Sequence, residues 1–231
     1  MSYHGLLFNH PAFQPSNAHL HAAWSRINNS RQQPTRELLS ESELFCLRLS
    51  IKLNAIDEAF EIMDMATHKL LLCYDAKHGY DLKEYQYHME TFVSKYVGIV
   101  DRSYILVGTA LSLNPKKLEK ASRRNLVDKG LEGANPAIEM KLKAIELETA
   151  DWKESRHQIA HSSGFTSDEY EILTKVFNMP YGFTGAERIS MLRDLYRNTT
   201  NELFERMEHL RTSVGALADS LGQSVLEKIA A

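Results

Sequence analysis

The chain has 231 residues, of which 43% are hydrophobic and 25% are charged, a composition typical of a globular protein with one large domain. The formal net charge of −3 at pH 7 argues against a protein that coats nucleic acid non-specifically, although a local basic patch could still hold a short RNA segment. No apolar run approaches the ~20 residues of a membrane span, and the N-terminus lacks the features of a signal peptide. We therefore expect a cytoplasmic protein with no membrane partner, in which Cys46 and Cys73 are reduced core thiols.

The first 38 residues contain several prolines and show no sustained hydrophobic periodicity. We interpret residues 1–38 as an N-terminal arm, partly irregular, that wraps the body of the protein or is partly disordered. Residues 39–231 are interpreted as a single helical domain.

From Ser40 onward the apolar residues follow the three-and-four spacing of amphipathic helices. The pattern predicts four long helices, over residues 40–74, 81–113, 136–161 and from 185 onward. Ser40 or Ser42 can cap the first of these helices, and Thr184 directly precedes the last. Because no segment alternates as a strand does, the sequence predicts an all-α, up-and-down bundle of four long helices with an N-terminal arm.

Residues 114–134 connect the second and third predicted helices and form the most basic stretch of the chain. Its cations include Lys116, Lys117, Arg123 and Arg124. The stretch is interpreted either as a solvated surface helix or as a rim that tracks RNA phosphates beside a site.

The end of the third predicted helix carries Arg156-His157-Gln158-Ile159-Ala160-His161, followed by Ser162-Ser163-Gly164. If the helix is continuous, its rotation of about 100° per residue places Arg156 inside the buried apolar stripe. His157 and His161, four residues apart, then share the flank of that stripe. A guanidinium can hold a phosphate and an imidazole can move a proton beside it. The alternative is a buried arginine paired with a carboxylate of another helix, beside two surface histidines.

This hexapeptide resembles the signature of the HEPN domain family, whose members are all-helical bundles with an arginine, a polar residue and a histidine at the end of a late helix. His157 stands where asparagine is often found, and Asp101 is a candidate for the supporting polar residue that many members carry on an earlier helix. The resemblance implies a homodimeric, metal-independent endoribonuclease that acts on RNA without a cofactor.

In that mechanism the 2′-hydroxyl of the RNA attacks the adjacent phosphorus. The resemblance assigns catalysis to Arg156, which would hold the scissile phosphate, and to His161, the general acid or base. His157 would bind substrate, and Lys116, Lys117, Arg123 and Arg124 are the further candidates for contact with RNA. Such domains occur in toxin–antitoxin and defence systems, so a neutralising antitoxin is a partner that the resemblance also implies.

Two other readings of the motif are open. The i, i+4 histidines His157 and His161 could ligate a metal, but Gln158 stands where a zinc protease requires glutamate, and no second Glu-x-x-His motif completes a di-iron site. The main alternative is a non-catalytic, HEPN-like helical module that binds a nucleotide, RNA or a protein partner.

Overall fold

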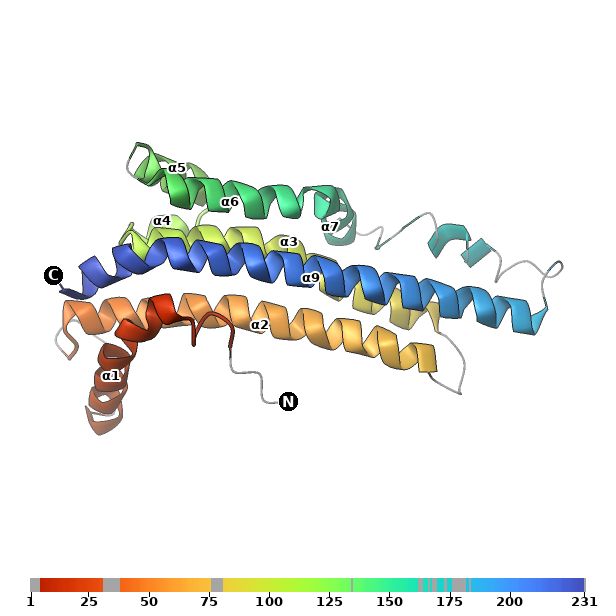
Figure 1. Cartoon of the computed structure of the whole chain (residues 1–231), viewed down its shortest axis with the longest axis horizontal. Helices are drawn as coiled ribbons and strands as arrows, with labels where there is room; N and C mark the ends of the chain where they lie inside the picture. The colour runs from red at the N-terminus through yellow and green to blue at the C-terminus, as the bar shows by residue number, and fades with distance from the viewer. Residues whose placement is uncertain are drawn as a thin grey trace. The chain divides into compact units, whose positions relative to one another are not determined.

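The computed structural model describes residues 5–30, 38–75, 81–133, 135–161, 164–165, 167, 170–172, 174–175, 182 and 184–230. Every regular element in this part of the chain is a helix, which confirms the all-α prediction there (Figure 1). The elements are η1 (Pro11–Ser16), α1 (Asn17–Ser30), α2 (Glu41–Asp75), α3 (Leu82–Ala110), α4 (Pro115–Leu118), α5 (Arg123–Leu131), α6 (Pro136–Glu148), η2 (Ala150–Trp152), α7 (Lys153–Ala160) and α9 (Gly185–Ala230). Within the described ranges, we find no helix with a stretch long and apolar enough to cross a membrane.

All four predicted helices begin within one residue of the expected position, at Glu41, Leu82, Pro136 and Gly185, and two of them start with reciprocal capping. The Ser40 hydroxyl accepts a hydrogen bond from the Glu43 amide (3.2 Å), while the Glu43 carboxylate accepts one from the Ser40 amide (2.8 Å). Thr184 and Glu187 repeat this arrangement at the start of α9, at 3.2 and 2.7 Å. Each box satisfies backbone donors that a helix N-terminus otherwise leaves without partners.

The prediction of one continuous helix over residues 136–161 is wrong. The segment forms α6, then the short 3-10 element η2, then the eight-residue helix α7. Because a 3-10 turn contains about three residues in place of 3.6, it changes the rotational phase of every residue that follows. The faces of α7 therefore do not continue the apolar stripe of α6.

The N-terminal segment is more regular than its sequence indicates, since it contains η1 and the 14-residue helix α1. Leu7 and Phe13 are completely buried. The carboxylate of Asp57, itself buried on α2, accepts hydrogen bonds from the amides of Leu7 (2.9 Å) and Phe8 (3.0 Å). This part of the segment is thus packed and hydrogen-bonded to α2.

The chain divides into two compact units, through both of which α2, α3 and α9 pass. The first unit comprises Met1–Glu58, Ile99–Glu148 and Arg211–Ala231, and the second comprises Ala59–Gly98 and Thr149–Leu210. Buried side chains of the first unit include Leu7, Phe13, Leu49, Leu53, Ile56, Ile99, Val127, Leu142, Leu217 and Leu221. Those of the second include Phe60, Met63, Leu70, Tyr85, Phe92, Tyr96, Phe165, Leu192, Tyr196 and Leu203.

The connector between α3 and α6 contains α4 and α5, where the sequence indicated one short helix. α5 contacts both α4 and α6. Gly108 of α3 permits the close approach of α4, because a Cβ atom at this position would lie 2.4 Å from Cδ2 of Leu118. Cys46 is buried, as expected, and the side chain of Cys73 lies outside the described residues.

Candidate functional site

The helix that carries the Arg-His-Gln-Ile-Ala-His sequence, α7, is anchored at its start by an aromatic cluster of the second unit. The ring of Trp152 lies 5.8 Å from that of Phe92 and 5.9 Å from that of Tyr96, centroid to centroid. The guanidinium of Arg206 lies 5.1 Å from the centroid of Trp152 and pairs with Asp151 at 2.8 Å. These contacts fix the residues directly before α7.

A second anchor follows the helix. Gly164 has a φ of +73°, and a Cβ atom there would lie 2.3 Å from Nε2 of Gln86 and 3.0 Å from Oε1 of Glu90. The amide of Phe165 donates a hydrogen bond to Glu90 (2.9 Å), and its buried ring lies 6.5 Å from that of Tyr85. The chain leaving α7 is therefore held against α3 at a residue whose positive φ favours glycine. Ser162 and Ser163 lie outside the described residues.

Between the two anchors, α7 presents its charged and titratable side chains to solvent. Arg156, His157 and His161 are all exposed, and no residue of α7 is buried. The prediction that Arg156 lies in the buried stripe is wrong, because η2 resets the helical phase upstream of it. The prediction that His157 and His161 are neighbours is confirmed, since their ring centroids lie 4.3 Å apart.

The cluster has the groups needed to bind an anion and transfer a proton beside it. Within the described part of the chain, the guanidinium of Arg156 has no hydrogen bond or ion pair with a protein group. Its donors are therefore available to a phosphate, for which arginine offers a bidentate fork. Imidazole is the side chain best suited to proton transfer near neutral pH. Helical geometry would separate the directions of Arg156 and His161 by about 140°, but His161 lies one residue beyond α7, as its C-cap.

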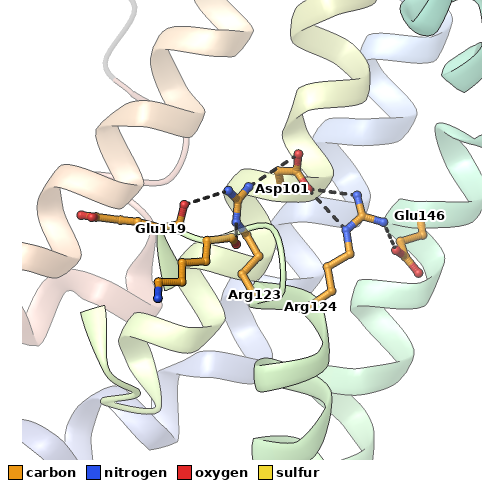
Figure 2. A network of polar contacts seen from close by, with 6 residues as sticks. Asp101, Glu119, Arg123, Arg124 and Glu146 are labelled. Atoms are coloured by element: carbon orange, nitrogen blue, oxygen red, sulfur yellow. Dashed lines mark hydrogen bonds and ion pairs between the residues drawn. The ribbon is translucent and has the colours of Figure 1, made fainter. Parts of the chain in front are cut away.

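The basic residues of the connector divide into two sets. Lys116 and Lys117 of α4 are exposed. Arg123 and Arg124 of α5 are only half-exposed, because both engage the carboxylate of Asp101 (Figure 2). All four lie in the first unit, whereas α7 lies in the second.

Arg124 makes the closer contacts of the pair. Its Nη2 lies 3.0 Å from Oδ1 of Asp101, and its Nη1 lies 2.8 Å from Oε1 of Glu146. Its guanidinium also lies 5.5 Å from the ring centroid of Tyr104. Figure 2 shows the arginine bridging the two carboxylates, one on α3 and the other on α6. Asp101 is therefore paired with α5. The two ion pairs of Arg124 explain the position of its guanidinium without an RNA phosphate as ligand.

A cavity of about 630 Å³ lies in the second unit beside α7, and no pattern in the sequence predicts it. Ser155 of α7, Trp152 and Tyr85 line one part of it, while Leu195 and Glu202 of α9 line another. Its residues come from three separate segments at no recognisable spacing, so a single sequence offers no pattern from which to find it.

Among the described residues, no three His, Cys, Asp or Glu side chains are grouped so that they could hold a metal ion. Comparison of the chain with protein-family models, with curated proteins and with solved structures finds no match.

Proposed function

We propose that the protein is a metal-independent endoribonuclease of HEPN type, with its active site at the end of α7. The 2′-oxygen of the RNA attacks the adjacent phosphorus as a base removes its proton. The P–O5′ bond then breaks and the leaving 5′-oxygen takes up a proton. The products are a 2′,3′-cyclic phosphate and a 5′-hydroxyl, so the step needs no other reactant.

The observation that carries the proposal is the joint exposure of Arg156, His157 and His161 on a short, doubly anchored helix. In the proposed mechanism Arg156 binds the non-bridging phosphate oxygens and stabilises the charge that develops on them. His161 acts as general acid or base. His157, whose ring is 4.3 Å from that of His161, positions the phosphate or supports the second imidazole.

The directions of the side chains lead us to include a homodimer in the proposal. Helical geometry would separate Arg156 and His161 by about 140°, and a second copy of the chain would then bring a guanidinium opposite an imidazole across the RNA. A protein that covered the same exposed surface would block the site, which is how a neutralising partner would act.

A separation of this size between Arg156 and His161 would also fit the alternative, a non-catalytic module. A single copy can bind a phosphate through Arg156 without placing His161 beside it. Such a module would retain binding to RNA or a nucleotide and would produce no cleavage.

The experiment is incubation of the purified protein with RNA in excess EDTA, together with His161→Ala, Arg156→Gln and the control Lys153→Gln. Lys153 is exposed on α7 outside the motif, so its replacement alters the local charge without touching the proposed chemistry. We expect cleavage to cyclic-phosphate ends by wild type and control, and a loss of about a hundredfold or more in both motif variants. Because Arg156 is exposed, its replacement does not perturb a core.

Unchanged cleavage by His161→Ala would refute the mechanism. Binding of RNA without cleavage, lost in Arg156→Gln, would establish the non-catalytic module in its place. Activity that disappears on chelation and returns with a divalent ion would contradict a metal-independent reaction. Mixing the two motif variants tests the dimer, since partial recovery of activity is expected only if one site draws on both copies.

A further inference from the structure

A second cavity, of about 640 Å³, lies within the first unit and belongs to no part of the proposed nuclease site. Its walls come from α2, α3 and α4, and Lys228 near the end of α9 also lines it. The apolar part of the lining consists of Phe45, Ile51, Ile105, Leu113, Pro115 and Leu118. The volume falls within the usual range of small-molecule sites, about 300–1,000 Å³.

The segments that line the cavity are held together by close packing and by hydrogen bonds. Leu118 reaches α3 only because Gly108 has no side chain, and the amide of Leu113 donates to the carbonyl of Gly108 (2.8 Å). The hydroxyl of Ser42 donates to the carbonyl of Ile229 (3.5 Å), which links the start of α2 to the end of α9. These contacts hold the lining segments together within the unit, so the cavity does not depend on a ligand to form it.

Cations outnumber carboxylates by one among the residues that line the cavity. Arg48 and Lys52 lie four residues apart on α2 and therefore on one face of that helix, and Lys228 adds a third positive charge. None of these three has a hydrogen bond or ion pair within the described residues. Two carboxylates, Glu41 and Glu119, also line the cavity, so the lining carries three positive and two negative charges, a formal net charge of +1.

From this combination we infer that the cavity binds an amphipathic anion, namely a straight-chain carboxylate. The aliphatic chain lies against Phe45, Ile105 and Leu118, and the headgroup pairs with Arg48 and Lys52. A cationic amphiphile would be repelled by the three cations, and the two carboxylates of the lining would offset only part of that repulsion. A nucleotide would find a single aromatic ring, Phe45, in the lining, too few for a base to stack between two.

The test is calorimetric titration of the full chain with octanoate, decanoate and dodecanoate, all below their micelle-forming concentrations. Decanol and decylamine serve as probes of equal chain length without the negative charge. We expect one site per chain, affinity that rises about fourfold for each added methylene, and little binding of decylamine. The dependence of affinity on length shows whether the aliphatic chain of the ligand is buried. The comparison of headgroups shows whether the cations of the lining contribute to binding.

Two variants separate the parts of the site. Arg48→Gln/Lys52→Gln should weaken decanoate binding on the order of tenfold or more. The control Lys116→Gln/Lys117→Gln removes the same charge from exposed positions of α4 outside the lining, and should bind within about twofold of wild type. Ile105→Trp, whose ring fills the cavity, should abolish binding at every chain length while circular dichroism shows a folded protein.

Saturable binding of decanoate that fails in the first variant and in Ile105→Trp, and persists in the control, would support the site. Absence of saturable binding, equal affinity for decanoate and decylamine, or affinity independent of chain length would each overturn it. If sedimentation shows a dimer that Ile51→Ser dissociates, the exposed edge of this cavity is a contact between copies, and the proposal also fails.

Discussion

Replacement of Arg124 by glutamine tests whether this arginine supports the fold or contacts RNA. The substitution removes the hydrogen bonds to Asp101 (3.0 and 3.3 Å) and the contact with Glu146 (2.8 Å). It also leaves two half-buried carboxylates without the cation that lies between them. Since the side chain of Arg124 is 37% exposed, solvent screens both ion pairs, and each contributes about 1 kcal/mol.

The free energy of unfolding should therefore fall by about 2 kcal/mol, which corresponds to a decrease in Tm of about 4–8 °C for a chain of this size. Urea unfolding followed by circular dichroism measures the change, and salt at about 1 M should reduce the difference from wild type. Lys116→Gln is the control, because Lys116 is exposed and its replacement should leave stability unchanged. If Arg124→Gln unfolds like wild type but binds RNA more weakly, the reasoning is refuted and Arg124 is a phosphate-binding residue.

Three further predictions concern residues outside the network. Asp57→Asn should lower the unfolding free energy by about 2–3 kcal/mol, because Leu7 and Phe8 donate to different carboxylate oxygens and one of these becomes an NH2 group that cannot accept; a urea midpoint equal to that of wild type would contradict this. Gly164→Ala should lower the unfolding free energy by about 1–2 kcal/mol because of its φ of +73°, while the end of the flexible Gln86 side chain can move away at little cost; an unchanged Tm would show that the chain after α7 is not held at this point. Burial and the negative charge of Glu43 raise the pKa of Cys46 to about 11. In a Cys73→Ser background, the Cys46 thiol should therefore react with a disulfide reagent at pH 8 roughly a hundredfold more slowly than free cysteine. A reaction rate equal to that of free cysteine would contradict this expectation.

The long helices could be predicted because each one combines a start signal with sustained periodicity. α2 follows Ser40 and α9 follows Thr184, and both capping residues have a glutamate three positions later. The all-α class follows from the same periodicity. α1 escaped prediction because prolines crowd the segment ahead of it, although its own 14 residues contain none.

The candidate site could be predicted only in part from the sequence. The proximity of His157 and His161 follows from their spacing of four residues on a helix, and the two rings are in contact in the structure. The exposure of Arg156 depends on η2, and residues 149–152 contain neither glycine nor proline to signal a break. The ion pairs of Arg124 join residues 22 and 23 positions apart, a separation that helical periodicity does not encode.

The two anchors of α7 have a consequence for how this surface could change over time. An isolated helix of eight residues is unstable in water, so α7 depends on Trp152 before it and on Gly164 and Phe165 after it. None of these anchoring residues belongs to the hexapeptide. Its exposed side chains, Arg156, His157 and His161, can therefore be exchanged with little effect on folding, and selection for a new ligand could act on them while the surrounding scaffold stays the same.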